Sequence, residues 1–135
     1  MNISDLITLL RTEIEKVGYK CYSPDLPQND EICSSLSLGQ GENQRAINQN
    51  ILYSEIPCYL LIRGTLSDED TRILADTIFN QLDMKKGLIL NNTRVILISC
   101  KTPNYAFRDE NQRIHYNINI DVKVEWRNEE STIHQ

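Results

Sequence analysis

The sequence predicts an α+β fold, in which a mixed, mostly antiparallel sheet carries two helices packed on one face and ends in a long C-terminal β-hairpin. Two segments, residues 3–17 and 70–82, have apolar residues three and four positions apart, the spacing of an amphipathic helix. Several other segments are β-branched or alternate between apolar and polar residues, which is typical of strands. This order of elements predicts that the helices gather on one face of a single sheet.

The length and composition of the chain predict one globular domain. With 135 residues, of which 40% are hydrophobic and 24% charged, residues 1–127 have room for one well-filled core. Residues 128–135 form a charged tail that we expect to fray. The longest unbroken apolar stretch, residues 58–62, is too short to cross a membrane, and the first residues lack the features of a secretory signal. These features predict a cytosolic protein with no membrane contact.

The N-terminal segment predicts an amphipathic helix of about fifteen residues. Asn2 or Ser4 can cap its free amides, and Gly18 can take the left-handed conformation that ends it. A short strand over residues 19–23 is expected next. Residues 24–30 then form a turn-rich connection, in which two prolines fix the backbone.

The middle of the chain predicts two strands separated by a loop. From Glu31 the pattern has period two and predicts a half-buried strand that ends at Gly39. Residues 42–50 are rich in amides and poor in apolar residues, which predicts a mobile loop. The most apolar run follows, and within it we expect a central strand, covered on both faces, over residues 56–63. Because proline is tolerated at the start of a strand, Pro57 indicates that the strand begins there.

A second helix is predicted directly after Gly64. The side chains of residues 67–70, Ser-Asp-Glu-Asp, can accept hydrogen bonds from the free amides and suit the positive end of a helix dipole. We therefore interpret this acidic start as a helix cap rather than as a metal or ligand site. Lys85 and Lys86 suit the negative end of the helix, and Gly87 is expected to end it.

Residues 94–101 and 112–126 predict an antiparallel hairpin whose second strand is unusually long. At ~3.3 Å per residue this strand rises about 50 Å, whereas a domain of this size has a radius of gyration of only ~14 Å. The hairpin must therefore bend or project. The polar face of its second strand consists of Asn117, Asn119, Asp121 and Lys123. This face is either a solvated sheet surface or a surface that pairs with other subunits.

Residues suited to catalysis or to cofactor binding are sparse. His115 falls on the polar face of the last strand and His134 in the C-terminal tail, and we interpret both as surface residues. Asp109 and Glu110 are adjacent acids that could bind a cation, although such pairs are more often solvated turns. The Gly39-Gln40-Gly41 segment lacks the lysine and the helix of a phosphate-binding loop. We expect no enzyme activity, no cofactor and no metal.

The spacing of the cysteines argues against a metal site, and the distribution of charge argues against DNA wrapping. The cysteines have no metal-ligand spacing, and we expect them to be reduced and mostly buried; they are Cys21, Cys33, Cys58 and Cys100. The net charge is −5 and the basic residues are scattered along the chain. This distribution argues against a protein that wraps duplex DNA, which needs a local stripe of Lys and Arg.

Several segments together resemble the tail terminator proteins of long-tailed phages, also described as minor capsid or tail completion proteins. The N-terminal amphipathic helix comes first, followed by the apolar strand of residues 56–64, which ends in Arg-Gly. The helix of residues 70–82, with alanine near its centre and leucine at its end, is also similar to that of the family. A strand, a loop with Pro103, the turn of residues 109–113 and a final alternating strand extend the resemblance over most of residues 1–126.

The resemblance implies a structural virion protein without catalytic activity. Members of the family form a hexameric ring on the last ring of the tail tube, stop its polymerisation and offer the opposite face to the head's connector. The implied partners are other copies of this chain, the tail-tube protein and the head-tail connector protein, and DNA passes through the lumen without specific binding. The chain can be a monomer in solution until the tube templates the ring. The implied location is the host cytoplasm during assembly and then the head-proximal end of the virion tail.

Two features depart from the family's pattern and leave alternatives open. Residues 42–50 are richer in amides than expected, and Gln112 stands where a glycine often precedes the arginine. A head-completion or neck protein, or the cap of a phage-derived contractile apparatus, would share most of the same features. A small cytosolic ligand-binding or regulatory domain belongs to another class and would need a stable apolar pocket.

For contacts with partners we predict the loop from Tyr105 to Arg113, together with Arg63. Exposed aromatic and arginine side chains next to apolar ones are the usual anchors of protein interfaces. The predicted interface residues are Arg63, Tyr105, Phe107, Arg108, Asp109 and Arg113. Ordinary packing or solvation is the alternative interpretation of each.

Overall fold

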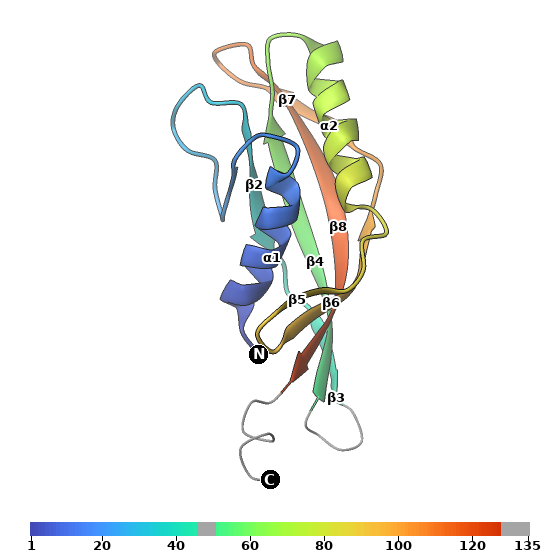
Figure 1. Ribbon diagram of the computed structural model, residues 1–135. Helices are drawn as coiled ribbons and strands as arrows, with labels where there is room; N and C mark the ends of the chain where they lie inside the picture. Colours follow the sequence, from blue (N-terminus) through green and yellow to red (C-terminus); the bar gives the residue numbers. More distant parts are fainter. Residues whose placement is uncertain (46–50, 128–135) are drawn as a thin grey trace.

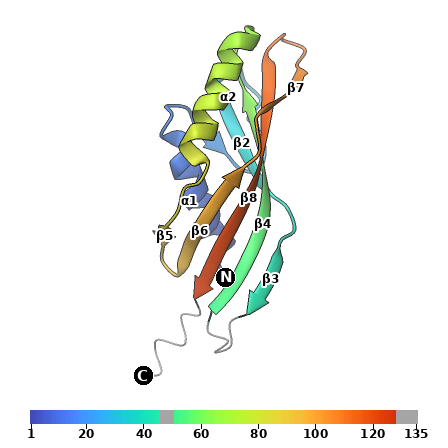
Figure 2. The ribbon, with the colours of Figure 1, turned by 90° about the vertical axis from the view of Figure 1, so that its right-hand side faces the viewer.

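The computed structural model describes residues 1–45 and 51–127, which form a sheet and a layer of helices. The elements in chain order are α1 (Ile3–Glu15), β1 (Cys21–Tyr22), β2 (Cys33–Leu38), β3 (Glu42–Arg45), β4 (Ile51–Arg63), α2 (Asp68–Leu82), β5 (Leu88–Leu90), β6 (Thr93–Cys100), β7 (Asn104–Arg108) and β8 (Ile114–Arg127). The sheet has eight strands in the order β1-β2-β4-β8-β6-β5, with β3 paired to β4 and β7 paired to β8 (Figure 1). Only the β1–β2 pair is parallel among these strands. Both helices lie on the same face of the sheet (Figure 2), so the predicted fold class is confirmed.

Helix α1 is capped as its sequence predicts. The Asn2 side chain accepts a hydrogen bond from the Asp5 amide at 3.2 Å, which satisfies one of the free donors at the start of the helix. Gly18 follows the helix with a φ of 105°, a conformation that strongly favours glycine. The apolar stripe of the helix is buried against the sheet and consists of Leu6, Leu10 and Ile14.

The centre of the fold is the antiparallel pair of β4 and β8, which runs the length of the molecule (Figure 2). The register extends from Ile51 opposite Arg127 to Arg63 opposite His115. The alternation predicted for β8 is confirmed, because its even-numbered residues from Ile114 to Trp126 are all buried on the helix side. Its opposite face is exposed at residues 119, 121 and 123.

The predicted start of the central strand at Pro57 is wrong, because β4 begins at Ile51. Pro57 lies opposite the break between β2 and β3, where the Gly39 amide donates to the Pro57 carbonyl at 2.7 Å. At this break no neighbouring strand needs the N–H group that proline lacks. Proline is therefore tolerated in the middle of this long strand.

The predicted loop of residues 42–50 is also wrong in part, since Glu42–Arg45 form β3 and pair with β4. Residues 46–50 lie outside the described residues. The two neighbouring strands are shorter than predicted: β1 has only two residues, and β2 begins at Cys33 rather than at Glu31. The first four residues of β2 are buried, so this strand is covered on both faces where it begins.

Helix α2 starts as predicted and ends earlier than predicted. The Ser67 side chain accepts a hydrogen bond from the Asp70 amide at 3.2 Å. Ser67 is therefore the cap of the helix, as the interpretation of residues 67–70 predicts. The helix ends at Leu82, five positions before Gly87. Met84 takes the left-handed conformation with a φ of 65°, and Gly87 does so again with a φ of 72° in the connection to β5. Lys85 therefore belongs to this connection and not to the helix.

The antiparallel pairing of β6 with β8 confirms the predicted hairpin, but its link contains a strand that the sequence analysis missed. Strand β7 pairs with the first part of β8, and a register shift lies between Tyr105 and Phe107. The short strand β5 was missed as well. It turns into β6 at Asn91, which has a positive φ of 53°.

The predicted state of the cysteines is confirmed. All four are free thiols, three of them are buried and Cys100 is half-buried. Burial raises the pKa of Cys21 to about 11 and those of Cys58 and Cys100 to about 12, so these thiols are protonated and unreactive at neutral pH. Residues 128–135, with His134 and the predicted frayed tail, lie outside the described residues.

Across residues 1–45 and 51–127, neither helix has the length and apolar character needed to span a bilayer.

Candidate interface at the tip of the sheet

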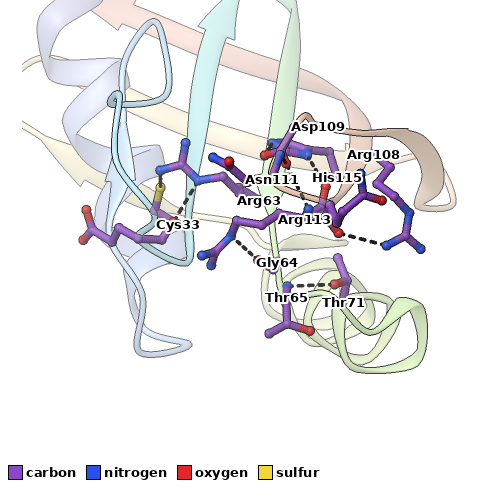
Figure 3. Close-up of polar contacts among 12 residues, drawn as sticks. Cys33, Arg63, Gly64, Thr65, Thr71, Arg108, Asp109, Asn111, Arg113 and His115 are labelled. Carbon is purple, nitrogen blue, oxygen red and sulfur yellow. Dashed lines mark hydrogen bonds and ion pairs between the residues drawn. The ribbon is translucent and has the colours of Figure 1, made fainter.

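Five of the six predicted interface residues meet at one end of the sheet, which we call the tip. The tip consists of residues 64–67, between β4 and α2, and residues 105–115, where β7 turns into β8 (Figures 1 and 3). Backbone hydrogen bonds join these two segments to each other. The Gly64 amide donates to the Ile114 carbonyl and the Ile114 amide donates to the Thr65 carbonyl, both at 2.9 Å.

Arg113 strengthens this connection through its side chain. Its Nε donates to the Gly64 carbonyl at 3.0 Å (Figure 3). Gly64 has no room for a side chain, because a Cβ atom would overlap the side chain of Thr71. The Thr71 hydroxyl in turn accepts from the Thr65 amide at 3.1 Å, so α2, β4 and β8 are joined at this point.

Asp109 fixes the turn between β7 and β8. One of its carboxylate oxygens accepts from the amides of Asn111 and Arg113, both at 2.9 Å, and its own amide donates to the Arg113 carbonyl at 3.0 Å. These bonds explain the acid at this position without a cation. Gln112 completes the turn with a φ of 66°, a left-handed conformation that favours glycine.

His115 is buried, so its predicted place on the surface is wrong. Its ring stacks on Phe107 with the ring centroids 4.2 Å apart and the planes 13° apart. Nδ1 lies 3.2 Å from the Arg113 carbonyl oxygen, and Nε2 lies 3.9 Å from a carboxylate oxygen of Asp109. Burial lowers the pKa of His115 and outweighs the opposite effects of this carbonyl and of Asp109. The ring is therefore neutral at neutral pH. Its burial depends on β7, which the sequence analysis missed.

Arg63 is buried as well, and the prediction that it is exposed is wrong. Its guanidinium group donates to the Glu31 and Pro27 carbonyls, both at 2.9 Å, and to the Asn29 side-chain oxygen at 2.8 Å. It also lies 3.6 Å from the sulfur of Cys33 (Figure 3). Arg63 thus holds the connection between β1 and β2 on the sheet, and it can act on a partner only through that connection.

The exposed apolar surface of the tip comes from three side chains. Tyr105 is 51% exposed, Phe107 is 44% exposed, and Leu66, which the sequence analysis missed, is 64% exposed. Tyr105 packs edge-on against Tyr116, which faces the helices, whereas Phe107 stacks on His115 on the other face. The tip therefore presents an aromatic ring on each side of the sheet.

Arg108 supplies an exposed positive charge at this surface. Its Nη1 donates to the Gln112 carbonyl at 2.8 Å and lies 3.4 Å from the Leu66 carbonyl oxygen. The guanidinium group is thus fixed between the two parts of the tip while the side chain stays exposed. Ordered arginine and aromatic side chains of this kind are favoured anchors of protein interfaces.

Two surface hollows lie away from the tip. One, of about 290 Å³, is lined by parts of β3, β4, β6 and β8, and the other, of about 470 Å³, lies between α1 and the β1–β2 edge. None of the predicted interface residues lines either hollow. Within the described ranges, no three His, Cys, Asp or Glu side chains are grouped as a metal site would require.

No protein-family model and no curated protein sequence matches this chain. Among solved structures, its fold is similar to that of a chain from the virion of a native gene transfer agent (GTA) particle, with a TM-score of 0.60 and 13% sequence identity. The alignment covers 90% of this chain and 92% of that chain. At this identity the likeness concerns the fold alone. The α+β fold described above is thus also found, over nearly its whole length, in a chain of a virion particle.

Proposed function

We propose that this protein is a structural component of a phage-like virion, which caps the tail tube as a hexameric ring, stops its polymerisation and provides the surface that joins tail to head. The observation that carries the proposal is the fold shared with a chain of a gene transfer agent virion over 90% of this chain. The order of elements that resembles tail terminator proteins supports the finer assignment. A ring needs a head-to-tail contact between copies and two unlike faces.

The tip is the surface proposed to contact the neighbouring protein of the tail. It combines exposed Leu66, Tyr105 and Phe107 with a fixed Arg108, and its backbone is tied to both β4 and β8. Such a surface loses little conformational freedom when a partner binds, which favours affinity. The proposed partners are other copies of the chain, the tail-tube protein and the head-tail connector protein. In the proposed location, the ring sits at the head-proximal end of the tail after assembly in the host cytoplasm.

Charge supports the proposed passage of DNA through the ring. Each copy carries a net charge of −5, so a ring of such chains is acidic. An acidic lumen repels the phosphate backbone and lets DNA slide without specific binding. The proposal requires that some of the acids line the lumen. An assembled ring with its acids confined to the outside would contradict this part of the proposal.

A polymerisation assay tests capping. Tail-tube protein from the same genome is allowed to polymerise with and without the purified chain, and tube lengths are measured by negative-stain electron microscopy. We expect shorter tubes with a ring at one end. A neck protein would leave the tube lengths unchanged, and that result would overturn the capping proposal.

A pair of variants tests whether the tip is the surface that contacts the tube. Leu66→Ser combined with Tyr105→Ser removes two exposed apolar side chains and leaves the internal hydrogen bonds of the tip in place. Met84→Ser, which changes a residue that is 58% exposed outside the tip, is the control. We expect the tip variant to lose capping while the control retains it. If both variants cap tubes like the unmodified chain, the tip is not the contact surface.

A further inference from the structure

Two isoleucines are exposed on opposite layers of the molecule. Ile73 lies on α2 and is 57% exposed, on the side of the helix away from the buried Ala75 and Ile78. Ile89 lies on β5 and is 64% exposed. It pairs with Arg94, whose neighbour Val95 is buried in the core, so Ile89 and Arg94 share the face of the sheet away from the helices.

The surroundings of Ile73 are acidic. Two acids, Glu69 and Asp70, lie four and three positions before Ile73 on the helix, and Asp76 lies three positions after it. The three acids therefore surround Ile73 on the helix surface. All three side chains belong to exposed residues. Arg72, the base next to Ile73 in the sequence, forms a salt bridge with Asp68 at 3.1 Å. We call Glu69, Asp70, Ile73 and Asp76 the acidic face.

The surroundings of Ile89 are basic. Arg94 is exposed directly opposite it in the β5–β6 pair, and Lys86 is exposed in the connection that leads into β5. The acid on the adjacent position of β8, Glu125, is buried and paired with Arg127 at 3.2 Å. It therefore does not cancel the charge of Arg94. We call Lys86, Ile89 and Arg94 the basic face.

We propose that the acidic face of one copy docks on the basic face of a second copy. The two faces have opposite charge and each has an exposed isoleucine at its centre, which is the arrangement of a small apolar contact with a charged rim. Because they are unlike surfaces of the same chain, the contact is head-to-tail and leaves a free face of each kind for the next copy. The inference rests on the ring proposed above and names the surfaces that would join its subunits.

A cross-linking experiment tests this contact even when it is transient. One chain carries Ile73→Cys and another carries Ile89→Cys, both in a Cys100→Ser background, since the other three cysteines are buried. The two chains are mixed and treated with a short bis-maleimide. The control pairs Met84→Cys, an exposed residue outside both faces, with Ile89→Cys. We expect several-fold more cross-linked dimer from the 73–89 pair than from the 84–89 pair.

Charge reversal tests the proposed chemistry of the same contact. Asp76→Lys in the first chain should lower the 73–89 yield several-fold, and Arg94→Glu in the second chain should restore it. A 73–89 yield no higher than the control, or one that charge reversal does not change, would overturn the proposal. Tube capping is measured separately. Capping without 73–89 cross-links would overturn these faces alone, whereas specific cross-links without capping would overturn the proposed function alone.

Discussion

Arg63 holds the connection between β1 and β2 on the sheet, and Arg63→Met tests this role. Methionine fills much of the space of the arginine stem but has no N–H donor. The substitution therefore removes the hydrogen bonds to the Pro27 and Glu31 carbonyls and to the Asn29 side chain, together with the weaker one to the Cys33 sulfur. We expect the connection to detach and the whole domain to lose stability.

The expected size of the effect follows from these contacts. A hydrogen bond to a charged group contributes about 1.5–3 kcal/mol, but the contributions of such bonds do not simply add. Asn29 is exposed, and Pro27 and Glu31 are half-buried, so water replaces part of what is lost. Removing a buried charge also removes its desolvation cost. We expect Arg63→Met to lower the free energy of unfolding by about 3 kcal/mol.

Urea unfolding measures this change, with the fluorescence of Trp126 as the signal, because it is the one tryptophan of the chain and is buried. Cleavage after Glu31 by a glutamate-specific protease reports the local detachment. The control is Arg108→Met, which changes an exposed arginine and should cost less than about 1 kcal/mol. If Arg63→Met costs no more than this control and the cleavage rate is unchanged, the role assigned to Arg63 is wrong.

Three further predictions concern the tip. Gln112→Gly should raise the free energy of unfolding by about 1 kcal/mol, because Gln112 has a φ of 66°, which glycine adopts without strain. Asn111→Gly is the control and should give no such gain. An equal gain at both positions would contradict the assignment of the effect to the left-handed conformation of Gln112. Gly64→Ala should cost about 1–3 kcal/mol in urea unfolding, because the added methyl group overlaps Thr71; a neutral result would show that α2 can shift freely. Because burial lowers the pKa of His115, the unfolded chain binds the proton more readily, and stability should fall as the pH drops below the ordinary value of 6.5. Urea unfolding from about pH 7.5 to about pH 5 should show a smaller loss for His115→Gln than for the unmodified chain, and equal losses would remove His115 as the cause.

The parts of the fold that the sequence predicts are those set by local patterns. The caps of both helices depend on Asn2 and Ser67, each of which lies three positions before the amide that it binds. The long strand β8 is evident from its alternation alone. In each case the residues that decide the structure lie within a few positions of one another, so one segment contains the whole signal.

The parts that could not be predicted depend on contacts between distant segments. Pro57 is tolerated within β4 because the break between β2 and β3 lies opposite it. Arg63 is buried because residues of the connection at 27–31 fold over it. His115 is buried because β7 places Phe107 against its ring. If β7 had been recognised in the sequence, its pairing with β8 would have placed Phe107 opposite His115. The sequence around Arg63 contains no comparable local pattern.

Deleting the gene for this chain from the genome that encodes it, and measuring tail lengths by electron microscopy, tests the proposal that the chain caps a tail tube. We expect tubes of excessive and variable length that are not joined to heads, and normal tails again when the gene is supplied in trans. Tails of normal length that fail to join heads would contradict capping and would indicate a neck protein instead.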